Sequence, residues 1–479
     1  MPPALGGICP PLGGDFSPVF REVSVVCLGE GFVLPELGGE SQPTRVFVST
    51  YHDTPDLALA RHGLTLRHRV ENGTGLWQLK LPRGLARAEL EQAGPPARPP
   101  IELVALLVAY LRGKELAPVA RLRTRRQVVR AGGAEIVDDF VSVLDGQRVR
   151  RRFRELEVEL VGGDEATLER LAEELRRAGA VAGDVRPKLY RALDLEVPAD
   201  DPAVSKGTPP LAALGLALGE QARRLLIHDP GVRLGSDPED LHQLRVATRR
   251  LRAFLRAGRP MLDRAWSEPL RDEIGWLGRA LGPARDLDVL VERLRADAAD
   301  VGAAVDGLLA ALEAEQSAAR VAVVGALSSD RYLALLGRLD DVSEPPGDGD
   351  AIPLRDIWRA EWKRTRKAFS RLDDASGDSD LHAGRIRVKR VRYAAELAAH
   401  ELGKRGRTFV DAAKELQDVL GAHQDATVAE ERIRAWAAGG GDAAAASLLL
   451  AREDARKEAS RGAWPEAWTA LRQAAKQLG

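Results

Sequence analysis

The stretch Leu241–Leu255, LHQLRVATRRLRAFL, decides how we interpret this sequence. On an α-helix, which turns by about 100° per residue, its basic residues fall inside a wedge of roughly 80°. This cationic stripe consists of His242, Arg245, Arg249 and Arg252. An apolar stripe about 120° away can pack into a core, and it consists of Leu244, Leu251 and Leu255. The stretch therefore predicts an amphipathic helix with one strongly basic face.

The same pattern returns in Leu381–Ala395, LHAGRIRVKRVRYAA. Its basic residues repeat the offsets of the first stripe, and they are His382, Arg385, Lys389 and Arg392. A Leu-Gly pair begins 39 residues after the first histidine (281 minus 242) and 38 after the second (420 minus 382). Because chance would not preserve both the offsets and the long spacing, we infer an internal duplication.

Two interpretations of the stripes compete. Arginine forks match phosphate oxygens and stay charged, and stacked cations repel one another by a few tenths of a kcal/mol per pair unless an anion neutralises them. Alternatively, the arginines form a solvated face or pair with acids such as Asp286 and Asp418. The second interpretation suits a single helix, whereas two helices duplicated at matched offsets favour anion binding.

The expected anion is phosphate without bases. Aromatic residues are scarce near the stripes, Tyr393 being the main exception, and single-stranded nucleic acids usually require aromatic stacking platforms. No helix-turn-helix or zinc-finger spacing is present in the sequence either.

Composition places few further limits on function. A chain of 479 residues exceeds one ordinary core, so we expect two or three domains. Lys and Arg number 70 against 71 Asp and Glu, so net charge neither indicates nor excludes a polyanion ligand. Cys9 and Cys27 are too few for a disulfide framework or a metal motif. We see no signal peptide or membrane span, and we expect a cytoplasmic protein.

The first two hundred residues have a strand pattern instead of the helical pattern of the basic stripes. After a flexible segment, 1–17, short alternating segments predict strands at 20–28, 44–51, 64–70, 76–81, 119–129, 135–144 and 152–160. Intervening helices are expected at 57–61, 101–111 and 166–178. Charges share strand faces, basic in some strands and acidic in 152–160. This pattern fits either a solvated sheet or a closed barrel with a charged bore, and alone it favours neither.

Four motifs resemble the CYTH family of triphosphate tunnel metalloenzymes: 51–57 (YHDTPDL), 63–67 (GLTLR), 77–82 (WQLKLP) and 153–159 (FRELEVE). The resemblance covers roughly 18–197 and implies an eight-stranded antiparallel barrel. By the resemblance, the tunnel residues that bind phosphate would be Arg67, Arg69, Lys80, Arg121, Arg123 and Lys188. The carboxylates that bind Mg²⁺ or Mn²⁺ would be Glu22, Glu155, Glu157 and Asp138.

This chain departs from the family on its first strand. The family signature there is Glu-x-Glu-x-Lys, whereas this chain has Phe20, Glu22 and Ser24 at those positions. A metal ligand and a phosphate contact are thus lost, and the resemblance implies a barrel impaired in catalysis. We assign no catalytic residue.

A linker rich in Pro and Asp spans 198–210, and strand patterns end there. Helical periodicity follows in two repeats, about 211–340 and 354–475. The helices are expected at 212–226, 241–255, 266–281, 286–299, 302–324, 331–338, 354–372, 381–401, 409–420, 427–438 and 443–459. This half, 211–479, is expected to be an all-α domain built by duplication.

The segments 242–246 (HQLRV), 285–289 (RDLDV), 389–393 (KRVRY) and 416–425 (LQDVLGAHQD) resemble the CHAD family, the conserved histidine α-helical domain. The resemblance implies two four-helix bundles and a basic channel that binds inorganic polyphosphate without a cofactor. We expect the binding residues to be the two stripes together with Arg250, Arg285, Arg390 and His423. In bacteria a CHAD domain often follows a CYTH domain, as here.

Taken together, the sequence predicts an α+β multidomain chain that binds polyphosphate, with an association with polyphosphate granules as a corollary. The alternative is a metal-dependent triphosphatase or polyphosphatase acting on tripolyphosphate or a nucleoside triphosphate in the tunnel, to which the helical half recruits substrate. A third hypothesis is nucleic-acid binding, which competition at a fixed salt concentration would test.

Overall fold

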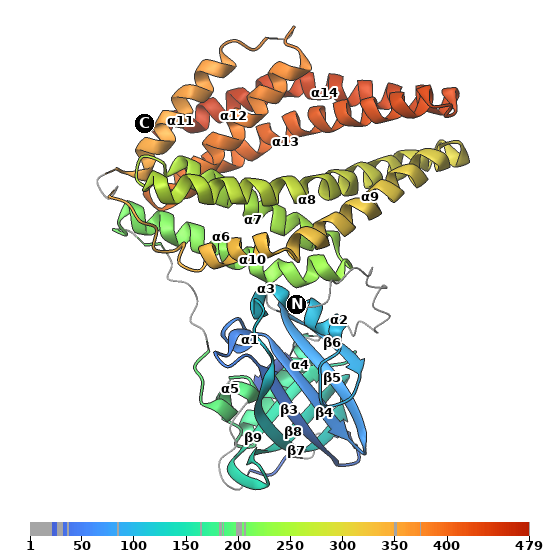
Figure 1. Cartoon of the computed structure of the whole chain (residues 1–479), viewed down its shortest axis with the longest axis vertical. Helices are drawn as coiled ribbons and strands as arrows, with labels where there is room; N and C mark the ends of the chain where they lie inside the picture. The colour runs from blue at the N-terminus through green and yellow to red at the C-terminus, as the bar shows by residue number, and fades with distance from the viewer. Residues whose placement is uncertain are drawn as a thin grey trace. The chain divides into compact units, whose positions relative to one another are not determined.

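The computed structural model describes residues 22–25, 32–35, 38–83, 86–162, 165–181, 184, 186–197, 204–205, 207–348, 352–373 and 375–478. The chain divides into two compact units, Met1–Asp200 and Asp201–Gly479. Figure 1 shows the first unit as a curled sheet with short helices, and the second as a set of long helices.

The first unit is built on one antiparallel sheet. Its strands are β1 Glu22–Val25, β2 Glu40–Ser41, β3 Arg45–Asp53, β4 Thr65–Glu71, β5 Thr74–Arg83, β6 Ala86–Ala93, β7 Ala117–Ala131, β8 Ala134–Asp145 and β9 Arg148–Leu160. Eight of them follow the order β1-β9-β8-β7-β3-β4-β5-β6, and β2 pairs with β7. The helices are α1 Ala58–Arg61, α2 Ile101–Ala105, α3 Val108–Leu111, α4 Glu165–Arg177 and α5 Lys188–Leu193.

The two faces of this sheet are filled differently. On the outer face, Leu168, Leu171 and Leu175 of α4 pack against Leu156 and Val158 of β9. On the inner face, a second apolar cluster joins the strands to α5 and consists of Tyr51, Ala60, Leu122, Val141, Val143, Leu189 and Tyr190. Part of the expected bore is therefore a packed core, and only the rest of the inner face is charged.

The expected strands are confirmed in the described residues, with two additions. The strand β6, ARAELEQA, was not expected because it lacks β-branched and aromatic residues, yet it pairs with β5 along its length. The short β2 was also not expected. The pairings of the described residues do not join β1 to β6.

The second unit is helical. Its first repeat comprises α6 Pro210–Leu234, α7 Pro238–Ala257, α8 Arg264–Ala298, the 3₁₀ turn η1 Gly302–Val305, α9 Asp306–Leu327 and α10 Asp330–Leu339. Its second repeat comprises α11 Leu354–Phe369, α12 Asp378–Leu397, α13 Ala399–Ala438 and α14 Ala443–Lys476. In each repeat, consecutive long helices pack on one another. None of the described helices is long and apolar enough to cross a membrane.

Two expected helix breaks are absent. Helix α8 runs unbroken through Leu281-Gly282-Pro283, and α13 runs through 421–426. A proline inside a helix removes one hydrogen bond, but Leu281 and Ala284 are fully buried on either side of Pro283. Packing of the flanking residues thus keeps α8 helical, and the sequence patterns on both sides belong to one element.

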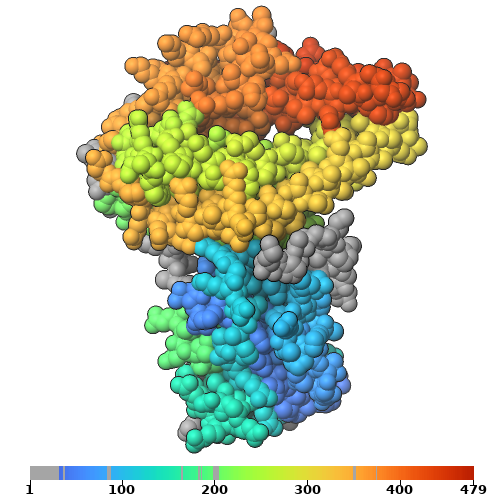
Figure 2. Space-filling model, viewed as in Figure 1, coloured from blue at the N-terminus to red at the C-terminus, as the bar shows by residue number. Residues whose placement is uncertain are grey.

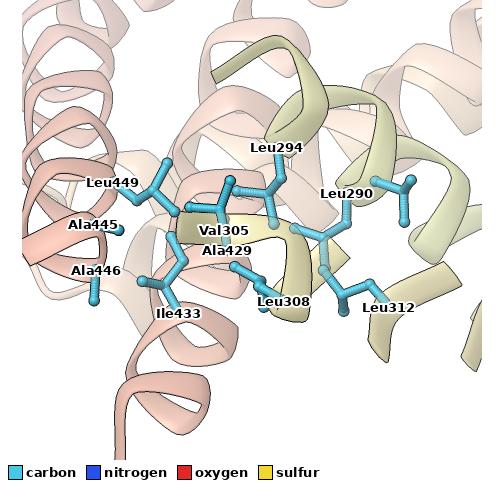
Figure 3. Packing of buried hydrophobic residues seen from close by; sticks show 11 residues of the cluster. Leu290, Leu294, Val305, Leu308, Leu312, Ala429, Ile433, Ala445, Ala446 and Leu449 are labelled. Atoms are coloured by element: carbon cyan, nitrogen blue, oxygen red, sulfur yellow. The ribbon is translucent and has the colours of Figure 1, made fainter. Parts of the chain in front are cut away.

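The two repeats contact one another at the ends of their long helices, in a cluster of buried apolar residues (Figure 3). The cluster, which we call the far-end cluster, consists of Leu290, Val291, Leu294, Val305, Leu308, Leu312, Ala429, Ile433, Ala445, Ala446 and Leu449. Ion pairs extend it, because Arg293 of α8 contacts Glu453 of α14 and Arg456 of α14 forks onto Asp297 of α8. Figure 2 shows a narrow opening between the two repeats.

Candidate functional site

The two basic stripes lie on helices that contact one another. Helix α7 begins where the sequence predicts, because the Asp237 carboxylate accepts a hydrogen bond from the Glu239 amide at 2.9 Å. Helix α7 then packs on α12, with the rings of Phe254 and Tyr393 edge to face at 6.5 Å. Since each helix comes from a different repeat, the duplication brings the stripes together at this contact.

The centre of the contact is strongly positive. Burial first, and then the charges of Arg385, Arg249 and Arg245, lower the pKa of Lys389 to about 7. Arg249 lies in the same positive environment. Burial and the charges of Arg245 and Arg392 lower the pKa of its guanidinium group. Neither Lys389 nor Arg249 forms an ion pair with a carboxylate in the described part of the chain. Such cations are stabilised when an anion binds between them.

Helices α8 and α13 add side chains to this surface, which we call the groove. Arg245 donates a hydrogen bond to Asp286 of α8 at 2.6 Å, and His382 Nδ1 lies 2.5 Å from Gln424 Oε1 of α13. Burial and then the charge of Arg285 lower the pKa of His242. The groove therefore consists of His242, Arg245, Arg249, Arg252, Arg285, His382, Arg385, Lys389 and Arg392.

Two glycines lie beside arginines of this surface. A Cβ on Gly421 would stand 3.4 Å from an Nη of Arg385, and one on Gly275 would stand 3.4 Å from Nε of Arg252 and 3.5 Å from an Nη of Arg279. Arg279 is therefore a neighbour of the groove that the sequence pattern did not indicate, since it belongs to neither stripe.

Three residues expected in the binding surface have charged neighbours that are not groove cations. Arg250 Nε pairs with Glu396 Oε2 at 3.2 Å. Arg390 has Arg387 and Glu361 as its charged neighbours. His423 is buried, with its Nε2 3.4 Å from Asp378 Oδ1. On α12, Arg390 lies about 100° around the helix from Lys389 and so leaves the stripe.

In the first unit, most of the expected tunnel cations do face inward, but each has a carboxylate partner. Arg69 pairs with Glu71 at 2.5 Å, and Lys80 pairs with Glu89 at 3.2 Å. Arg67 donates to Gln78 at 2.7 Å and lies 3.9 Å from Glu89. These cations are therefore largely neutralised by the protein itself.

Lys188 is the most completely paired of them. Its Nζ lies 3.0 Å from Glu157, 3.1 Å from Asp139 and 3.5 Å from Glu155. Burial alone would lower the pKa of Lys188, but the three carboxylates outweigh it and raise that pKa. Burial raises the pKa of Glu155 against the opposing charge of Lys188.

Two further cations complete this inner cluster. Arg126 forks onto Asp139 at 2.8 and 2.7 Å, and Arg191 lies 3.6 Å from Glu155. The cluster thus joins three carboxyl groups to three cations, and much of its charge is compensated by the protein itself.

Asp138, Arg121 and Arg123 were assigned to the wrong face. Directly paired residues share a face, and Glu155 pairs with Asp139 while Arg126 also pairs with Asp139. Asp138 instead points to the outer face, where Arg154 forks onto it at 2.8 and 2.7 Å. Arg121 and Arg123 are exposed on that outer face.

A bulge explains the error at Asp138. Leu144 pairs with Val149 and Val143 with Arg151, so Arg150 is an extra residue in β9, and without it the hairpin would align Asp138 with Glu155. The face of Arg121 and Arg123 is set instead by the pairing of β7 with β3, in which Arg123 lies opposite Val48 and Arg121 opposite Thr50. A one-residue shift moves every side chain to the other face.

The expected metal site does not fit the described residues. Within them, no three His, Cys, Asp or Glu side chains are arranged to hold a metal ion. Glu155 and Glu157 do share the inner face, but the ammonium of Lys188 lies between them and Asp139. Phe20 and the side chains of Glu22 and Ser24 lie outside the described part of the structure, although the backbone of Ser24 pairs with Glu157.

Each half of the chain matches a known domain family. The CYTH domain family matches residues 29–190, and the CHAD domain family matches 216–434. The uncharacterized protein Rv2226 of Mycobacterium tuberculosis (strain H37Rv) is 32% identical over 440 residues, which cover 82% of this chain and 83% of that protein. The uncharacterized protein MT2285 of strain CDC 1551 matches to the same extent.

Solved structures resemble parts of the chain. PptA from Streptomyces chartreusis is 25% identical with a TM-score of 0.46, over 55% of this chain and 100% of that one. The CHAD domain from the plant Ricinus communis is 29% identical with a TM-score of 0.48, over 57% of this chain and 95% of that one. The adenylyl cyclase-like HpAC1 from Hippeastrum is described as having a dominant triphosphatase activity. It is 16% identical with a TM-score of 0.23, over 33% of this chain and 86% of that one.

Proposed function

The chain belongs to the family of proteins that join a CYTH domain to a CHAD domain, and on this premise we propose that it binds inorganic polyphosphate in the groove between α7 and α12. The observation that carries the proposal is the approach of Lys389 and Arg249 from two repeats without a described carboxylate partner. A chain of phosphates would place repeated negative charge along these cations, and arginine forks suit its oxygens.

Nucleic acid fits the groove less well. Tyr393, the aromatic residue closest in sequence to the second stripe, is 5% exposed and packs against Phe254. A ring held in this way has no free face on which a base could stack. The groove therefore favours a ligand that consists of phosphate alone.

The alternative is a hydrolase that uses Mg²⁺ or Mn²⁺ in the barrel. The shared inner face of Glu155 and Glu157 supports it, whereas the position of Lys188 among the carboxylates opposes it. We propose that the barrel turns over tripolyphosphate slowly or not at all. Phosphate release with either metal tests this. Turnover comparable with that of an active triphosphatase would favour the alternative, and Phe20→Glu with Ser24→Lys should raise a weak activity.

The groove itself is tested by charge reversal. In the full chain, Arg249→Glu with Lys389→Glu should abolish binding of long-chain polyphosphate in titration calorimetry, because two central cations become anions. The matched control is Lys404→Glu with Arg407→Glu on α13, which makes the same change in net charge at exposed positions. The control should bind like the parent. If the groove variant also binds like the parent while it remains folded, the groove is not the binding site.

A further inference from the structure

The duplication relates α7 and α12 residue by residue. The two histidines are 140 positions apart (382 minus 242), so Arg250 corresponds to Arg390 and Arg256 to Glu396. Arg250 lies 3.2 Å from Glu396, and Arg392 lies 3.5 Å from the same carboxylate. A twofold relation that places position 250 against 396 also places 390 against 256.

The sequence breaks this symmetry at one position. Where the first contact joins an arginine to a glutamate, its counterpart joins Arg390 to Arg256. Accordingly, burial and then the charge of Arg390 lower the pKa of Arg256, and Arg387 acts in the same direction. Arg256, Arg387 and Arg390, which we call the Arg256 cluster, form no ion pair with a carboxylate in the described residues.

One acid lies near the Arg256 cluster, and it is already engaged. Glu361 of α11 accepts a hydrogen bond from Arg364 at 2.7 Å through Oε1. Glu361 opposes the lowering of the pKa of Arg256 and Arg390, but one carboxylate cannot balance three guanidinium groups and Arg364. Like charges held together in partial burial are unfavourable unless a counter-ion joins them.

We propose that the Arg256 cluster is a second phosphate-binding site, in which an oxyanion takes the place that the Glu396 carboxylate has on the symmetry-related side of the α7–α12 contact. Three guanidinium groups from two helices offer paired donors to a tetrahedral oxyanion. The ligand is a phosphate group, either free as orthophosphate or pyrophosphate, or carried by a polyphosphate chain. None of its residues is among the nine that define the groove, so the two sites can be tested separately.

The experiment uses the full chain carrying Arg249→Glu and Lys389→Glu, so that the two central cations of the groove are reversed in charge. Pyrophosphate, orthophosphate and long polyphosphate are titrated in turn. Binding of either small anion assigns the site to free phosphate, and binding of the long chain alone assigns it to a polyphosphate segment. Both outcomes support the site. If none of the three binds, the proposal is overturned, whatever the result for the groove in the otherwise unmodified chain.

Single substitutions in the same background identify the residues. Arg390→Gln should weaken binding by about tenfold or more, as expected for the loss of a charge-assisted contact. Its matched control is the symmetry-related Arg250→Gln, which removes a cation already paired with Glu396 and should leave affinity within about twofold. Glu361→Gln should strengthen binding, because it removes the nearby negative charge. Equal effects of Arg390→Gln and Arg250→Gln would overturn the assignment, with circular dichroism confirming that each variant folds.

Discussion

Lys188 of α5 donates a hydrogen bond to Glu157 of β9 over 3.0 Å, and the same ammonium lies 3.1 Å from Asp139 of β8. The ammonium group of Lys188 thus lies among the carboxylates of the inner sheet face. This contact links three elements of the first unit and makes the charge on the inner face of the sheet a property of the fold.

Removing that cation should destabilise the first unit and create an affinity for metal. Lys188→Met leaves three buried carboxylates with two cations, which is expected to cost about 3–5 kcal/mol at neutral pH. Mn²⁺ should raise the melting temperature of this variant and leave that of the parent unchanged. The control Lys114→Met breaks an exposed pair with Asp56 and should cost less than about 1 kcal/mol. A variant that melts like the parent and ignores Mn²⁺ would contradict this account.

The same contact sets a pH dependence. Because the pKa of Lys188 is raised above its ordinary value, its stabilising effect in the parent persists through the neutral range and is lost only as pH rises through the raised pKa. In Lys188→Met the carboxylates lose a favourable charge, so the destabilisation should shrink as acid protonates them. Thermal melts of parent and variant between about pH 4 and 8 would show the two curves converging at low pH.

Much of the architecture could be predicted from sequence, because periodicity and duplication are strong signals. The stripes on α7 and α12 follow from spacing, the inward position of Glu155 and Glu157 from the family resemblance, and the division near residue 200 from the composition of the linker. The register of β8 against β9 could not be predicted, because it depends on the bulge at Arg150. The position of Arg250 could not be predicted either, since its partner Glu396 is 146 residues away (396 minus 250).

Lys389 should take up a proton when polyphosphate binds. Its pKa of about 7 in the free protein is lowered by burial and neighbouring cations, and a polyanion would raise it toward the ordinary value near 10.5. Between those two values the complex holds more protons than the free protein, so affinity should fall as pH rises from about 7 to 9. Calorimetry at pH 8.5 in Tris and in HEPES measures the uptake. Lys389→Arg should bind without it, and equal enthalpies for the parent in both buffers would refute the linkage.

Binding should also depend on salt through individual groove cations. By analogy with single-stranded nucleic acids, each phosphate contact releases about 0.7 of a counter-ion, so the logarithm of the association constant should fall linearly with the logarithm of salt concentration. Arg249→Gln should flatten that slope by about one such unit. Lys404→Gln, at an exposed position of α13, should leave the slope unchanged. An affinity for long polyphosphate that is insensitive to salt would count against the groove.

The far-end cluster should control how fast a long chain leaves. The two repeats are joined at the α7–α12 contact and again at this cluster, so a polyphosphate chain lying between them is enclosed on two sides. Ile433 of α13 is fully buried in the cluster, and Ile433→Ala is expected to weaken it by about 2–5 kcal/mol. We expect faster hydrogen exchange at the ends of α8, α13 and α14 and faster dissociation of long polyphosphate. Tripolyphosphate, which is short enough to leave by sliding, should dissociate at the parent rate. Leu335→Ala, an equally buried truncation in α10, is the control for general destabilisation and should leave both rates unchanged. If it speeds the release of long chains as much as Ile433→Ala does, the far-end cluster has no specific role in retaining the ligand.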